Sequence, residues 1–327
     1  MNIENIEFIN HDAYKIYDGK RDHKKIAITS KNCEYQISKI QYQPYQNSLD
    51  KSGVENTMFP GVIYVFYDLI FSTWSIPSPE ELLDAYYGQY NDQITVAGDK
   101  VCFQSQVFEK KDVDGRLMRT YPSLLRDFHF YLLLAESGQF DEVRYSCKTD
   151  ISGKDIIVVI NNLEYEVSLF VKTRRSLAYK TQKNSYRHSY ETEIQVPLDL
   201  GHSRKFGDIN LYSYTYMRFL FRQIQKYDAR QNWDGPELNS LSEGDHAVGW
   251  YILKSIYCKN TEARRPFLVA ELSDKTGELN VVVWNYKGNI DEDDLGKRVH
   301  VFGTVKPYRD KLQIESAGIL LASEQDD

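Results

Sequence analysis

The pattern of hydrophobic and polar positions is strand-like from Asp245 onward, apart from one acidic, partly helical connection at 286–296. Short apolar or alternating runs separated by turn residues are typical of β-strands. Five strands are predicted, at 246–257, 267–273, 278–285, 298–306 and 312–321. The turn 274–277 joins the second strand to the third, and the turn 308–311 joins the fourth to the fifth. This spacing predicts a small β-barrel.

Three stretches of this barrel resemble a known family: LSEGDHAVGWYILKS, FLVAELSDKTGELNVVVW and GKRVHVFGTVKPYRDKLQIES. They resemble the anti-codon-binding and exoribonuclease-associated OB domains, in which an L-x-D-x-T-G turn and a following tryptophan mark the second and third strands. The long connection between the third and fourth strands fits the same fold. The resemblance covers 241–323. It implies DNA or RNA as the partner, held as a single strand on the face of strands two and three.

Aromatic and basic residues on this barrel are the candidate contacts. The residues expected to stack on bases are Phe267, Trp284 and Tyr308. Those expected to contact the backbone are Lys254, Arg264, Arg265, Lys306 and Arg309. Two alternatives stay open. Phe267 and Trp284 could instead fill the barrel core, and 11 Lys and Arg against 12 Asp and Glu in 241–323 would also suit a barrel that holds protein.

Residues 120–227 predict the order helix, three strands, helix, strand, helix. The helices are expected at 122–136, 174–188 and 212–227. The strands are expected at 143–148, 155–160, 164–173 and 193–198. Pro122 favours the start of the first helix and Gly138 its end. The segment therefore predicts a mixed α/β core.

Two carboxylates of this core, Asp155 and Glu166, fall on neighbouring strands. A two-residue turn at 161–162 would pair Ile160 with Leu163 and make the two carboxylates diagonal neighbours on one face. The pattern resembles the PD-(D/E)XK restriction-endonuclease-like superfamily. That resemblance implies that both carboxylates hold Mg²⁺ or Mn²⁺ and that a lysine assists the attacking water.

The sequence departs from the superfamily at its lysine position, where Ser168 stands. Lys172, on the same strand, and Lys183, in the following helix, are the expected substitutes. With them the segment predicts a metal-dependent nuclease. The alternatives are a core that has lost this chemistry and an ordinary solvated strand face.

A run of basic residues follows these strands. Between Lys172 and His188 there are six Lys and Arg and no carboxylate. Such a run could neutralise phosphates, although a solvated helix face is the ordinary explanation. The residues expected to bind nucleic acid are Arg174, Arg175, Lys180 and Arg187.

The remaining segments complete an α+β multidomain chain. Residues 1–119 predict a separate mixed α/β domain of unknown role, and 228–240 a linker. Within the first, strands are expected at 26–28, 35–40, 61–66 and 94–107, a helix at 78–87, and a turn-rich boundary at 109–119.

Composition narrows the possible functions. The net charge of −7 confines any nucleic-acid contact to local patches. The four scattered cysteines suggest neither zinc nor disulfides, and without a signal peptide or membrane span the chain is expected in the cytoplasm. No phosphate-binding glycine loop or hydrolase motif is present. The alternative to a nuclease is a non-catalytic subunit that binds nucleic acid or protein in a larger defence, transposition or repair complex.

Overall fold

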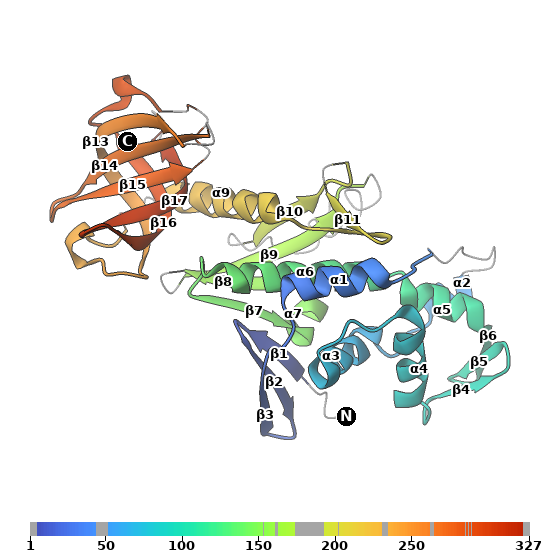
Figure 1. Ribbon diagram of the computed structural model, residues 1–327. Helices are drawn as coiled ribbons and strands as arrows, with labels where there is room; N and C mark the ends of the chain where they lie inside the picture. Colours follow the sequence, from blue (N-terminus) through green and yellow to red (C-terminus); the bar gives the residue numbers. More distant parts are fainter. Residues whose placement is uncertain are drawn as a thin grey trace.

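A computed structural model describes residues 5–43, 52–152, 154–160, 163–173, 193–201, 203–230, 235–261, 265–284, 286, 288 and 290–322. In this part of the chain an α/β unit leads through one long helix into a β-barrel (Figure 1). No helix of the described segments is long and apolar enough to cross a membrane.

A seven-stranded sheet forms the centre of the α/β unit, in the order β10-β9-β8-β7-β1-β2-β3. Its strands are β1 (Asn5–Ile9), β2 (Asp12–Tyr17), β3 (Lys20–Lys25), β7 (Glu142–Ser146), β8 (Ile156–Ile160), β9 (Leu163–Val171) and β10 (Glu193–Leu198). β9 and β10 are parallel, whereas the other neighbours are antiparallel. The four strands predicted for the middle segment are therefore present at one end of a larger sheet.

Helices and two small sheets surround this centre. The described helices are α1 (Ser30–Lys39), α2 (Ser52–Asn56), α3 (Val62–Thr73), α4 (Pro79–Gln89), α5 (Lys110–Met118), α6 (Tyr121–Ser137), α7 (Cys147–Ser152) and α9 (Tyr214–Arg230). The small sheets are β4 (Ile94–Ala97), β5 (Lys100–Phe103) and β6 (Gln106–Glu109), and β11 (Arg204–Phe206) with β12 (Ile209–Leu211). The predicted helices at 78–87, 122–136 and 212–227 are confirmed as α4, α6 and α9.

Several expectations for the first hundred residues are wrong. The strands expected at 35–40 and 61–66 are parts of the helices α1 and α3, and 26–28 follows the end of β3. In α1 the Thr29 side chain caps the helix by accepting a hydrogen bond from the Asn32 amide, and the buried Cys33 and Ile37 lie one turn apart. The apolar run of α3 is buried on most of its surface, and for such a run periodicity does not separate helix from strand.

The expected boundary at 109–119 does not divide the fold. Most of it is the helix α5, and β1 pairs with β7 across it. The Phe8 ring of β1 lies 5.7 Å from the ring of Tyr67 and 5.5 Å from that of Phe128. Since these residues come from both sides of the boundary, the separate N-terminal domain is replaced by one sheet and one core.

The barrel closes in the order β13-β14-β15-β17-β16. Its strands are β13 (His246–Asn260), β14 (Pro266–Ser273), β15 (Glu278–Trp284), β16 (Arg298–Tyr308) and β17 (Lys311–Leu321). The five predicted strands are confirmed, with the long connection between the third and fourth. Buried apolar residues such as Leu268, Ala270 and Val281 fill the interior.

The helix α9 runs from the region of β10 to the barrel and packs against one side of it (Figure 1). The rings of Phe221 and Phe302 lie 4.8 Å apart, and Gln225 Nε2 donates to the Gly318 carbonyl at 2.9 Å. On the same side, His246 Nε2 lies 3.3 Å from a carboxylate oxygen of Asp141. The contacts of α9 fall on β13, β16 and β17, so the outer face of β14 and β15 lies away from the helix.

Candidate nucleic-acid interface

Three side chains form a row across the outer face of β13, β14 and β15. The strand register pairs Lys259 with Phe267, and Phe267 with Trp284. The alternate positions on β14, Leu268 and Ala270, point into the barrel and are completely buried. Because successive side chains of a strand point to opposite faces, Phe267 lies on the outside.

Neither aromatic ring of this row fills the barrel core. Trp284 is 43% exposed, and the Phe267 ring lies beside it with centroids 5.0 Å apart. The indole Nε1 donates a 2.7 Å hydrogen bond to Glu315 Oε1. The other carboxylate oxygen of Glu315 lies 2.6 Å from Lys306 Nζ. The two rings thus form a fixed aromatic platform, which we call the Phe267–Trp284 platform.

A further aromatic residue, Tyr257, extends this face and escaped the sequence analysis. It is 61% exposed and pairs with Val269, two residues along β14 from Phe267. A β-bulge between Leu253 and Ser255 shifts the register of β13 and reverses which later residues face outward. Simple alternation from Trp250 would therefore point Tyr257 into the barrel.

Two of the predicted basic contacts, Lys254 and Lys306, are already paired with carboxylates. Lys254 Nζ lies 3.3 Å from Glu278, and Lys306 contacts Glu315. Tyr308 is exposed at the turn between β16 and β17, with the Arg309 guanidinium 5.4 Å from its ring centroid. Arg265 is exposed, and Arg264 lies outside the described residues. Lys254 and Lys306 could thus contact a phosphate only by giving up a carboxylate, whereas Arg265 and Arg309 have no carboxylate partner among the described residues.

The carboxylates of the middle segment have the predicted register. Ile160 pairs with Leu163 and Ile157 with Glu166, and extending the ladder places Asp155 opposite Ser168. The Asp155 carboxylate accepts a hydrogen bond from the Leu169 amide and so continues the ladder past the end of β8. Asp155 therefore has a structural role of its own.

A lysine contacts Glu166, although it is not one of the lysines that the sequence suggested. The partner is Lys154, whose Nζ forms an ion pair with Glu166 Oε1. Lys172 is exposed just beyond the end of β9, and Ser168 is buried. Lys154 was overlooked because it precedes the strand instead of following the glutamate.

No group of three or more His, Cys, Asp or Glu side chains that could hold a metal ion occurs among the described residues. Glu166 is neutralised by Lys154, and Asp155 is bonded to backbone. As arranged, Asp155 and Glu166 do not fit Mg²⁺, which needs several oxygen ligands around it. The residues Arg174, Arg175, Lys180, Lys183 and Arg187 lie outside the described residues.

The closed five-stranded barrel, with the long connection after its third strand and an aromatic platform on β14 and β15, has the architecture of an OB fold. Residues 249–319 match the sequence model of the family described as "OB-fold nucleic acid binding domain". The C-terminal barrel is therefore an OB-fold nucleic-acid-binding domain. None of the curated proteins matches the chain.

Several solved structures are similar to parts of the chain. A domain of replication protein A from Methanococcus maripaludis is 20% identical, with a TM-score of 0.24, and the match covers 26% of this chain and 92% of that one. A replication protein A heterotrimer bound to ssDNA is 18% identical, with a TM-score of 0.21 and coverages of 32% and 80%. A murine DNA binding protein bound with ds DNA is 11% identical, with a TM-score of 0.26 and coverages of 51% and 84%.

Proposed function

We propose that this protein binds single-stranded DNA or RNA across the outer face of β13, β14 and β15. The observation that carries the proposal is the Phe267–Trp284 platform. Lys259 of β13 lies beside Phe267, and Tyr257 lies two residues from Lys259 on the same strand. Unpaired bases present flat faces that stack on such rings, whereas a duplex keeps its bases stacked inside the helix.

The charge of this face indicates which interaction dominates. Glu271 and Glu278 lie on the same strands as Phe267 and Trp284, and Glu315 lies on the neighbouring β17. These three carboxylates oppose phosphate binding. Each base stacked on an aromatic ring contributes about 1–3 kcal/mol, largely independent of salt. Binding should therefore depend on stacking more than on counterion release, and weaken only moderately as salt rises.

Fluorescence anisotropy of the full chain with a labelled single strand, in DNA and RNA versions, tests this proposal. The expected result is saturable binding of at least one single strand, with the matching duplex bound more weakly. The double variant Trp284→Ala/Tyr308→Ala should lose most of the affinity. Binding unaffected by the double variant would contradict the stacking face.

We also propose that the middle unit cleaves phosphodiester bonds, because one specific observation favours it. Lys154 lies against Glu166, which supplies a lysine that the PD-(D/E)XK resemblance requires and that Ser168 does not provide. The order α6, β7, β8, β9 and a parallel β10 also follows the helix–strand arrangement of that superfamily. In this proposal the ion pair with Glu166 orients Lys154, whose ammonium group would contact the scissile phosphate and assist the attacking water.

Incubation with plasmid, single-stranded DNA and RNA in Mg²⁺ or Mn²⁺ tests the cleavage proposal. Metal-dependent cleavage should disappear in Glu166→Gln and Lys154→Met. Asp155→Asn should lose cleavage too, provided that its thermal unfolding matches that of the parent. If no substrate is cut, the chain is instead a binding subunit of a larger nucleic-acid complex, and single-strand binding by the barrel should persist.

A further inference from the structure

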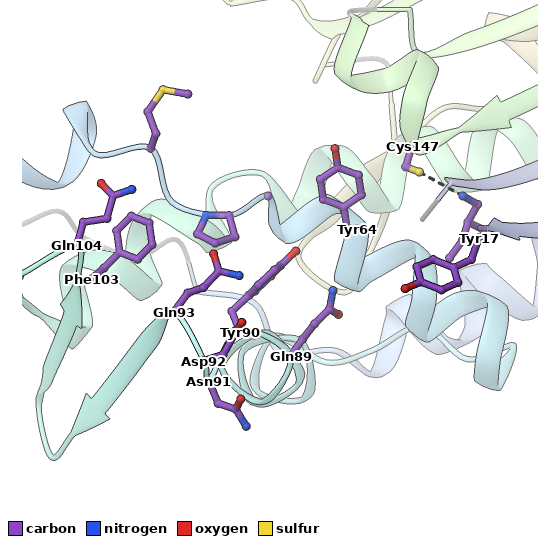
Figure 2. Close-up of a pocket in the computed structure, with 14 residues that line it drawn as sticks. Tyr17, Tyr64, Gln89, Tyr90, Asn91, Asp92, Gln93, Phe103, Gln104 and Cys147 are labelled. Carbon is purple, nitrogen blue, oxygen red and sulfur yellow. Dashed lines mark hydrogen bonds between the residues drawn. The ribbon is translucent and has the colours of Figure 1, made fainter. Parts of the chain in front are cut away.

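A pocket of about 600 Å³ lies in the α/β unit, between the end of α4, the start of α3 and the turn from β5 to β6 (Figure 2). It continues past Tyr64 toward Tyr17 on β2. α4 and the β4–β6 sheet are at the opposite end of the molecule from the barrel (Figure 1). The pocket is thus separate from both surfaces described above.

Aromatic rings that line the pocket are held by a second layer of rings. Phe103 is stacked on Phe59 with centroids 5.0 Å apart, and Tyr90 meets the Tyr86 ring edge-on at 5.1 Å. A Cβ at Gly61 would lie 3.2 Å from the Tyr64 ring, so this glycine lets the ring approach the chain closely. Rings fixed in advance lose little conformational freedom when a flat ligand binds.

Beside the hydroxyl groups of Tyr17, Tyr64 and Tyr90, four primary amides line the pocket. They belong to Gln89, Asn91, Gln93 and Gln104, and Asp92 adds one carboxylate. None of the four amides bonds to another described residue, and no Lys, Arg or His is among the lining residues. Figure 2 shows Gln89, Asn91 and Gln93 gathered around the end of α4. The pocket therefore suits a ligand that is polar but carries no phosphate at the point of contact.

The turn that presents Gln104 is strained. Gln104 and Ser105 have φ angles of 47° and 63°, in the left-handed region that hairpin turns usually fill with Asn and Gly. Non-glycine residues in this region raise the energy of the fold and are frequent at ligand sites. The strain supports a binding role for this rim.

We propose that this pocket binds a nucleobase that carries an exocyclic amino group, namely guanine, adenine or cytosine. A base offers two flat faces to the aromatic walls and an edge of alternating donors and acceptors to the amides. The Asp92 carboxylate only accepts hydrogen bonds, so it selects amino groups over carbonyls. A sugar would satisfy the amides but has no flat π face to stack.

Isothermal titration of the full chain with guanosine, adenosine, cytidine and uridine, and with methyl glucoside, tests the pocket. At least one amino-bearing nucleoside should bind, and uridine should bind about tenfold or more weakly, the difference of one well-made hydrogen bond. Nucleoside monophosphates should bind no more tightly than the nucleosides. Equal binding of uridine, preference for the sugar, or no nucleoside binding would overturn the proposal.

Variants of exposed or half-exposed residues locate the site without disturbing the core. Gln93→Ala/Gln104→Ala should weaken nucleoside binding about tenfold, and Asp92→Asn should reduce the discrimination against uridine. Gln106→Ala is the matched control, because Gln106 is exposed on the neighbouring β6 and does not line the pocket. An equal loss in the control would overturn the assignment. Trp284→Ala/Tyr308→Ala should leave nucleoside affinity unchanged, which keeps this test independent of the barrel.

Discussion

The indole Nε1 of Trp284 on β15 donates a 2.7 Å hydrogen bond to Glu315 on the neighbouring β17. The same carboxylate binds Lys306 of β16 at 2.6 Å. Glu315 therefore connects an aromatic platform to a cation and orients the indole. It also places a negative charge on the face where we propose that a nucleic-acid backbone passes.

Replacing this carboxylate separates the two effects. Glu315→Gln keeps an oxygen that can accept the indole hydrogen bond but removes the charge and releases Lys306 for a phosphate. We expect single-strand affinity to rise about threefold at low salt, since exposed charge pairs contribute about 0.2–1 kcal/mol. Anisotropy titrations measure the affinity, and Glu243→Gln is the control, because Glu243 is an exposed carboxylate that precedes β13 and lies outside the barrel strands. A weaker-binding Glu315→Gln variant would contradict the repulsive role.

Removal of Tyr257 tests whether the platform extends along β13. Tyr257→Ala should lower single-strand affinity by about 1–3 kcal/mol, the contribution of one stacked base, and Tyr257→Phe should retain most of it. Tyr35→Ala is the matched control, because Tyr35 is 62% exposed on α1, outside the barrel. If both alanine variants bind like the parent, the bound strand does not reach Tyr257.

Alanine variants of two lysines of β13 should differ in how strongly their affinity for a single strand depends on salt. Lys259 has no ion-pair partner among the described residues, whereas Lys254 contacts Glu278. Lys259→Ala should therefore reduce the slope of log affinity against log salt by about one. Lys254→Ala should change it less. Affinities measured at several salt concentrations give the slope for each variant. Equal slopes for the two variants would show that the bound phosphates do not contact Lys259.

The barrel could be predicted because each of its strands is short, alternating and separated by a recognisable turn. The helices α1 and α3 could not be predicted, because Tyr35, Ile37 and the apolar residues of α3 are equally typical of strands. For α1 the capping residue Thr29 was the only local signal, and α3 has no side-chain cap. The sheet order could not be predicted either, since β1 reaches β7 across more than a hundred residues of intervening chain.

The residues of the candidate sites were also only partly predictable from the sequence. Trp284 and Phe267 were identified because alternation within β14 and β15 is regular, whereas the bulge after Leu253 concealed Tyr257. Lys154 contacts Glu166 because β9 returns antiparallel to β8, which brings Glu166 back beside the start of β8. The amides of the α4 pocket come from separate turns, so their grouping depends on tertiary structure.

The Asp274 turn should stabilise the entry into the barrel. One carboxylate oxygen accepts the Leu238 amide at 2.7 Å, and the other accepts the Thr276 amide and hydroxyl. Burial alone would raise the pKa of Asp274, but these hydrogen bonds hold it below its ordinary value. Asp274→Ala should lower the free energy of unfolding by about 1–3 kcal/mol in urea titrations at pH 7.

The pH dependence of this effect has a definite sign. Because the folded-state pKa is lowered, the stabilisation is present above the unfolded pKa of about 3.9 and is lost as pH falls through the folded value. The difference between parent and Asp274→Ala should therefore shrink only in strong acid. A variant as stable as the parent at pH 7 would show that the turn is held by other contacts.

His300 should make the protein acid-sensitive. The ring is completely buried, 5.2 Å from Trp250, and neither of its nitrogens has a hydrogen-bond partner among the described residues. Burial lowers the pKa of His300 to about 3. The unfolded chain binds this proton below about pH 6.5 and the folded chain does not, so stability falls from pH 6.5 toward 3, by about 2 kcal/mol at pH 5. His300→Phe removes the titrating group and both unpaired nitrogens, so it should unfold at higher urea than the parent at pH 5, with a smaller gain at pH 7.5.

If the parent and His300→Phe lose equal stability between pH 7.5 and pH 5, other groups cause the acid sensitivity. His246 is the first of these to test, through His246→Gln, because burial also lowers the pKa of His246.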